Sequence, residues 1–146
     1  MNNPVTKTPA HLWVVGVVSL LWNAIGANDY LQTRMRNMDY LGSMGFTDEA
    51  MAYIDGFPIW VDIAWGLGVW GAVAGSILLL LRRKQATIAF ALSLIGAFLS
   101  NLYPYISNPP EIMQQPAAKI MPVVIIVIAI LLLYYSRRQS ANGVLR

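Results

Sequence analysis

The stretch Ile120–Tyr135 reads IMPVVIIVIAILLLYY, and its centre, Val123–Leu133, has no polar face at all. A helix that is apolar on every side belongs in a protein core or in lipid. Three further apolar stretches precede it: Leu12–Tyr30, Ile59–Leu81 and Ala86–Ser100. A hydrocarbon core is spanned by about 20 apolar residues in a helix. With 57% hydrophobic residues and a mean hydropathy of +0.53, the chain is predicted to be an all-α integral membrane four-helix bundle.

The chain is expected to form one transmembrane domain, residues 1–146. The spans are expected at about 11–31, 58–81, 86–105 and 119–136. The first helix is expected to continue to about Met38, because nothing in Leu31–Met38 breaks a helix. The segment 101–119 is rich in proline and is predicted to be irregular backbone outside the lipid.

A short external helix is predicted between the first two spans. Gly42–Gly45 predicts a turn, and Thr47 is a suitable N-cap for a helix over Asp48–Ile54. This helix is expected to lie on the bilayer, with Met51 and Ile54 toward the lipid.

The charges predict the orientation. Seven bases and no acids flank one side of the spans: Lys7, Arg82, Arg83, Lys84, Arg137, Arg138 and Arg146. The other side holds three bases and all seven acids: Arg34, Arg36, Lys119, Asp29, Asp39, Asp48, Glu49, Asp55, Asp62 and Glu111. Lys and Arg beside the spans stay cytoplasmic. Both termini are therefore expected inside, and loops 31–58 and 101–119 outside.

The environment is expected to be a bacterial inner membrane, because the chain has no cysteine for an external disulfide framework. The first span is expected to stay attached, since Trp22 and Asn23 stand where a signal-peptide cleavage region needs small residues. The basic rim requires no nucleic-acid partner, and the lipid bilayer is the expected partner.

Small residues repeat at steps of three and four in the first three spans. The predicted helix-packing residues are Gly16, Ser19 and Gly26, then Gly68, Gly71 and Gly75, then Ser93 and Gly96. Such stripes let helices approach closely in lipid. The fourth span has no such stripe and is predicted to be the most lipid-exposed helix.

Polar and aromatic residues gather toward the acidic ends of the spans. The candidate ligand-binding residues are Asn23, Asn28, Asp29, Asp62, Trp22, Trp65 and Asn101. An ionisable group at membrane depth suggests a functional site. Structural roles remain open: Asp62 as a helix cap, Asn23 bonded to a neighbouring helix, and Asp29 as a solvated boundary residue.

No enzymatic activity, metal or cofactor is expected. His11 is the only histidine and is expected at the inner interface, so neither a metal site with several histidines nor a Ser–His relay is expected within one chain. The chain also has no phosphate-binding glycine loop.

The stretches LWNAIGANDY at 21–30, MAYIDGFP at 51–58 and the Gly- and Trp-rich segment 65–75 resemble a family of small bacterial four-span proteins. The resemblance covers about three quarters of the chain. Some members of that family are labelled sugar transporters. The resemblance implies a solute-binding role, with Asn23, Asn28, Asp29 and Asp62 on or beside its motifs.

Two functions are therefore considered. One is a small-solute carrier or binding protein, acting as a homo-oligomer on a small polar, sugar-like molecule. The other is a non-transporting accessory or scaffold subunit that docks to a membrane-protein partner through its glycine stripes.

Overall fold

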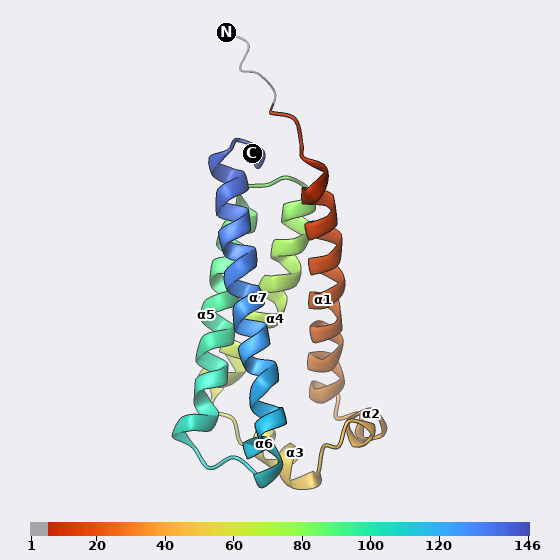
Figure 1. Ribbon diagram of the computed structural model, residues 1–146. Helices are drawn as coiled ribbons and strands as arrows, with labels where there is room; N and C mark the ends of the chain where they lie inside the picture. The colour runs from red at the N-terminus through yellow and green to blue at the C-terminus, as the bar shows by residue number, and fades with distance from the viewer. Residues whose placement is uncertain (1–5) are drawn as a thin grey trace.

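The computed structural model describes residues 6–146, and this range contains seven helices and no strand (Figure 1). The four long helices are α1 (Ala10–Arg34), α4 (Ile59–Leu80), α5 (Gln85–Ile106) and α7 (Pro116–Ala141). Each is long and apolar enough to cross a membrane. The three short helices are α2 (Met38–Ser43), α3 (Asp48–Asp55) and α6 (Glu111–Gln114). The prediction of an all-α membrane bundle with four long apolar helices is confirmed.

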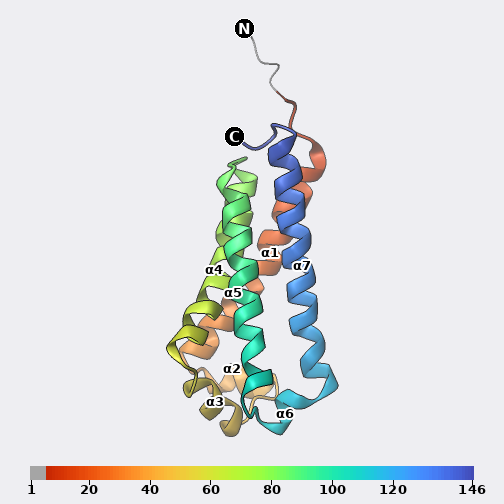
Figure 2. The same ribbon diagram turned by 90° about the vertical axis from the view of Figure 1, so that its left-hand side faces the viewer.

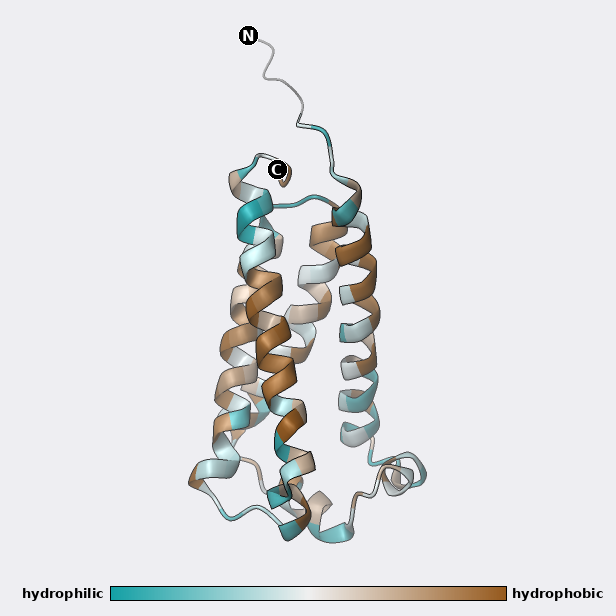
Figure 3. Cartoon of the chain, in the orientation of Figure 1, coloured by the Kyte–Doolittle hydropathy of each residue, from teal (hydrophilic) through white to brown (hydrophobic). Residues whose placement is uncertain are grey.

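The two ends of the bundle differ in charge. The C-terminus and the Arg82–Lys84 connection lie at one end, which we call the basic end (Figure 1). The three short helices lie at the opposite end, which we call the acidic end. Figure 3 shows α7 hydrophobic through its middle and more hydrophilic toward both of its ends. The arrangement is that of a helical bundle with an apolar middle, which suits a membrane-spanning protein.

Helix α4 packs against α5 through small residues, because any side chain there would meet backbone. A Cβ on Gly96 would lie 2.5 Å from the Ala64 carbonyl oxygen and 2.6 Å from the Gly68 nitrogen. The Ser93 hydroxyl donates to the Gly68 carbonyl at 2.6 Å. A Cβ on Gly71 would lie 3.1–3.2 Å from Ser93 and Ala89 atoms. The two backbones are therefore in direct contact, as small residues allow in lipid.

Further contacts of this kind occur toward the basic end. A Cβ on Gly75 would lie 2.6 Å from the Phe90 ring, and one on Gly16 of α1 would lie 2.4 Å from the Leu80 side chain. Ser19 is buried and its hydroxyl donates to the Gly16 carbonyl within its own helix. Gly26 does not belong to this set: it is exposed, and nothing lies within 4 Å of a Cβ built on it. The prediction that Gly26 packs against another helix of this chain is wrong, because no other helix of the chain comes close to that position.

Helix α7 packs mainly against α5 (Figure 2). Only 6% of its most apolar stretch is buried, compared with 22%, 22% and 28% for the other three long helices. The fourth span is therefore the least buried of the four long helices, as predicted, and its contact with lipid stays a prediction. At the basic end, however, Leu132 joins a buried cluster with Leu12, Leu79 and Phe90.

The last residues of the chain belong to that cluster. Leu145 is fully buried beside Leu12 and Leu79. The Arg146 amide donates to the Arg82 carbonyl at 2.7 Å, and the Lys84 amide donates to the Arg146 carbonyl at 3.0 Å. The segment after α7 thus binds the α4–α5 connection and closes the basic end.

Two predictions about the segment between α1 and α4 need correction, and a third is confirmed. Helix α1 ends at Arg34 rather than near Met38, because Arg36 adopts a left-handed conformation with φ of 55°. The expected turn is partly the helix α2, which Asn37 caps by accepting a hydrogen bond from the Tyr40 amide. Thr47 caps α3 as predicted, with its hydroxyl oxygen 3.2 Å from the Ala50 nitrogen.

The expected contact of α3 with lipid is not found. Met51 and Ile54 are buried against Leu41, and partly buried aromatic residues and Met113 pack around them. The apolar face of α3 therefore contacts protein. The reason is α2, which supplies a partner for that face that the sequence pattern did not reveal.

The segment 101–119 is more helical than predicted. Pro104 lies inside the last turn of α5, and α6 follows after a short connection. Pro116 is the first residue of α7, where a proline's missing N–H costs nothing, so α7 begins before residue 119 and continues past 136. A second proline, Pro122, lies inside α7.

Candidate functional site

Asn23 forms a bridge between α1 and α4. Its Nδ2 donates to the Ser76 hydroxyl at 2.9 Å and to the Ala72 carbonyl at 3.2 Å. Ser76 is fully buried. A carboxamide placed this way holds two helices together where lipid offers no competing hydrogen-bond partner. The geometry matches the structural role considered for Asn23.

Asp62 forms an ion pair with Arg34. The distance between Asp62 Oδ1 and Arg34 Nη1 is 2.9 Å, and the two side chains are 25% and 42% exposed. The pair joins the first turn of α4 to the last turn of α1. Asp62 therefore contacts a protein cation rather than open space.

Asp29 and Asn28 interact with Tyr40 of α2. The Tyr40 hydroxyl donates to Asp29 Oδ1, and Asn28 Nδ2 lies 3.3 Å from the same hydroxyl. The hydrogen bond to the Asp29 carboxylate, with smaller effects of burial and of the negative charge, raises the pKa of Tyr40 above its usual 10.0. These contacts attach α2 to the acidic end of α1.

Of the two candidate tryptophans, Trp65 lies in an aromatic cluster. Its ring centroid is 4.7 Å from that of Tyr30 and 6.3 Å from that of Phe57, both in edge-on arrangements. Such pairs stabilise packing beyond the area they bury. Trp22 is half-buried on α1.

The structure therefore divides the seven predicted ligand-binding residues. Six lie on α1 and α4: Trp22, Asn23, Asn28, Asp29, Asp62 and Trp65. All of these except Trp22 have the protein partners described above. Asn101 lies on α5 and lines a cavity that none of the other six reaches. The expected single polar cluster does not form, because α4 separates α1 from α5.

The cavity lies between the acidic halves of α5 and α7 and has a volume of about 940 Å³. This is at the upper end of the roughly 300–1,000 Å³ typical of ligand pockets. The α2–α3 connection, α3 and α6 contribute to the wall at the acidic end. The lining residues are Met44, Gly45, Phe46, Ala50, Phe98, Asn101, Leu102, Pro104, Tyr105, Ser107, Asn108, Pro109, Ile112, Met113, Gln114, Ala118, Lys119, Met121, Pro122, Val123, Ile126 and Val127.

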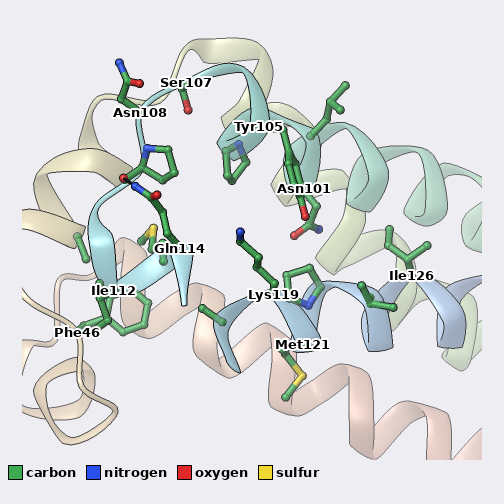
Figure 4. A pocket seen from close by; sticks show the side chains of 18 of the residues that line it. Phe46, Asn101, Tyr105, Ser107, Asn108, Ile112, Gln114, Lys119, Met121 and Ile126 are labelled. Carbon is green, nitrogen blue, oxygen red and sulfur yellow. Dashed lines mark hydrogen bonds between the residues drawn. The ribbon is translucent and has the colours of Figure 1, made fainter. Parts of the chain in front are cut away.

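Most of the cavity wall is apolar, and its polar side chains gather in one region. Figure 4 shows Lys119 with its ammonium directed between Gln114 and Asn101, whereas Ile126 lies further along α7. Pro122 has no N–H, so the Ala118 carbonyl beside it lacks its usual helical hydrogen bond. The site combines one cation, several hydrogen-bonding groups and a long apolar wall.

Two hydroxyls fix the wall that α3 and α5 share. The Tyr53 hydroxyl oxygen lies 2.6 Å from Ser107 Oγ, and Ser107 in turn donates to the Tyr103 carbonyl. Burial raises the pKa of Tyr53 above 10.0. Tyr53 therefore stays neutral at ordinary pH, and the tether between α3 and α5 remains intact.

Lys119 and Gln114 are the site residues that the sequence analysis missed. The structure makes Lys119 stand out, because the other two bases at the acidic end, Arg34 and Arg36, bind Asp62 and Asp55. Within residues 6–146, no three His, Cys, Asp or Glu side chains gather in a way that would hold a metal ion. Comparison of the chain with protein-family models, with curated proteins and with solved structures finds no match.

Proposed function

We propose that this chain is a small membrane protein that binds one amphiphilic molecule in the cavity between α5 and α7. The observation that carries the proposal is the division of the cavity wall. Polar groups of Asn101, Gln114 and Lys119 stand together, and apolar residues of α5 and α7 line the long wall beyond them. Apolar residues of the α2–α3 connection, α3 and α6 complete the wall at the acidic end. A molecule with a polar head and an apolar chain matches both parts.

The proposed orientation follows from the basic residues. Lys and Arg next to spans remain in the cytoplasm, so in the proposed orientation the basic end faces the cytoplasm and the chain spans a bacterial inner membrane. The cavity then lies in the outer half of the bilayer, within reach of outer-leaflet lipids. Binding is the minimal function, and carriage across the membrane would require assembly with further copies of the chain.

The contacts of the α1–α4 polar residues support this choice over a sugar site between α1 and α4. Asp62 is paired with Arg34, and Asn23 is bonded to Ser76 and Ala72. A sugar at that interface would first have to break these contacts. Breaking each one would leave a polar side chain without its partner, which costs free energy.

The accessory-subunit function remains the second candidate, and the position of Gly26 favours it. Gly26 is exposed, nothing lies within 4 Å of a Cβ built on it, and α1 also exposes the apolar residues Val18, Leu21 and Ile25. A small residue on an apolar surface permits close approach by a helix of another protein.

A cavity-filling substitution tests the proposal. Val123 lines the cavity and is 60% exposed, whereas Ile125, on the same helix, does not line it and is 37% exposed. The purified protein is mixed in mild detergent with lysophosphatidylglycerol or lysophosphatidylcholine of one acyl chain, and bound lipid is counted by native mass spectrometry. We expect one lipid per wild-type chain, its loss in Val123→Trp and its retention in Ile125→Trp. Absence of any Val123-dependent binding overturns the proposal and leaves the accessory function ahead.

A further inference from the structure

We infer that the cavity selects an anionic amphiphile and that Lys119 binds its negatively charged head group. This inference rests on the proposed function and specifies the class of ligand. It follows from three features of the molecule: the charges at the acidic end, the direction of the Lys119 side chain, and the lining of α7 beyond it.

Lys119 differs from the other bases at the acidic end. Arg34 is paired with Asp62, and Arg36 is paired with Asp55. Among the described residues 6–146, no carboxylate oxygen lies within 4.0 Å of the Lys119 ammonium. The ammonium is therefore available to a ligand anion.

The neighbours of Lys119 define the rest of the head-group site. Asn101 Nδ2 donates to the Ala97 carbonyl at 2.7 Å, and Gln114 Nε2 donates to the Pro109 carbonyl at 2.7 Å. The side-chain oxygens of both amides remain as acceptors. Figure 4 shows the Lys119 ammonium between these two side chains. One cation beside acceptors suits a head group with an anionic oxygen and neighbouring hydroxyls, such as a glycerol phosphate.

The apolar part of the cavity continues along α7. From Lys119 to Val127 the helix rises about 12 Å, at 1.5 Å per residue, and the lining on this stretch includes Val123, Ile126 and Val127. Phe98 and Leu102 of α5 contribute to the opposite wall. An acyl chain attached to a head group at Lys119 would lie between these two walls and bury its apolar surface.

An interfacial anchor is the simplest other role for Lys119. Lysines at the ends of spans extend toward bulk lipid head groups. An anchor of that kind favours anionic bilayers without holding one lipid in one place. The chain offers a matched control for this difference in Lys84, a lysine at the basic end outside the cavity.

The test compares lysophosphatidylglycerol with lysophosphatidylcholine of the same acyl chain. Their dissociation constants are measured by native mass spectrometry for the wild type, Lys119→Gln, Lys119→Arg and Lys84→Gln, with a thermal melt to show that each variant is folded. We expect the wild type to prefer the anionic lipid by roughly three- to tenfold, the effect of one partly solvated charge pair. The preference should persist in Lys119→Arg and Lys84→Gln, disappear in Lys119→Gln, and weaken in high salt.

The outcomes separate the two proposals. If both lipids bind in a Val123-dependent way but Lys119→Gln keeps the preference, the inference is wrong and the proposed function stands. An equal loss in Lys84→Gln also overturns the inference, because the preference then reflects net charge. If neither lipid binds in the cavity, the proposed function fails and the inference fails with it.

Discussion

Arg34 and Asp62 lie at the acidic ends of α1 and α4 and bind each other at 2.9 Å, although the α2–α3 segment separates them along the chain. The pair holds the end of α1 close to the start of α4. The α2–α3 segment begins at the first of these points and ends at the second. It also explains why an acid stands at this depth: the carboxylate lies in the first turn of α4, which favours negative charge, and has a cation opposite.

Loss of the Arg34–Asp62 ion pair should have a small effect on stability and none on the cavity. For Asp62→Asn we expect a loss of about 0–1 kcal/mol in the free energy of unfolding, because both side chains are partly solvated. A double-mutant cycle with Arg34→Gln in a reversible unfolding assay measures the coupling. Lysolipid binding should be unchanged in Asp62→Asn, and a loss of binding in a folded variant would return Asp62 to the ligand site.

Two glycines give opposite expectations for the same substitution. Gly96→Ala should destabilise the bundle by several kcal/mol or prevent folding, since the new methyl group would lie 2.5 Å from the Ala64 carbonyl oxygen. Gly26→Ala should be neutral or slightly stabilising, because nothing lies near it and alanine favours helix by up to about 1 kcal/mol. Thermal melts of both variants check this. Unfolding of Gly26→Ala would indicate a contact with another chain at that position.

Asn23 should contribute more to stability than its neighbour Asn28. Asn23→Ala removes two hydrogen bonds between α1 and α4 and leaves the buried Ser76 hydroxyl without one of its partners. We expect a loss of about 0.5–2 kcal/mol, the range for polar contacts between membrane helices. Asn28→Ala is the control, because its hydrogen bonds of 3.3 and 3.4 Å lie at an exposed position. Equal losses in the two variants would contradict the bridging role of Asn23.

Alkaline pH should weaken the attachment of α2. The pKa of Tyr40 is raised above 10.0 in the folded protein by its hydrogen bond to Asp29. Above about pH 10 the unfolded chain loses this proton first, so the folded state binds more protons and stability falls as pH rises. In Asp29→Asn the pKa of Tyr40 should move back toward 10.0.

The measurement for Tyr40 is phenolate absorbance during a pH titration. The titration curve of Tyr40→Phe is subtracted from that of the wild type, and the difference gives the absorbance of Tyr40 without the other six tyrosines. An identical midpoint with and without the Asp29 carboxylate would show that the hydrogen bond does not set the pKa.

Local features of the fold were predictable because neighbouring residues determine them. Thr47 caps α3 through a bond to an amide three residues away, and the glycines of α4 and α5 mark their contact by their spacing. The end of α1 was not predictable from the sequence, because Arg36 adopts a positive φ, which is usual for glycine or asparagine but not for arginine. Helix α2 was missed because Gly42, which was interpreted as part of a turn, lies inside the helix.

The site was harder to predict than the fold. Sequence spacing gives the depth of a residue in a span, and Asp62 and Asn101 were both correctly expected near the acidic end. It does not give the rotation of one helix relative to another. Asp62 faces α1 and Asn101 faces the space beside α7, so residues at similar depth belong to different environments. Lys119 was missed because a single base near a span carries no pattern.

The burial of Leu145 beside Leu12 has a consequence for synthesis of the protein. Helices α1, α4 and α5 can pair as each enters the membrane, because their contacts join segments made one after another. The contact at the basic end needs one residue from near the start of the chain and one that is translated after all four long helices. Leu12 lacks that neighbour until residue 145 has been translated, so this contact at the basic end can form only after all four long helices have been made.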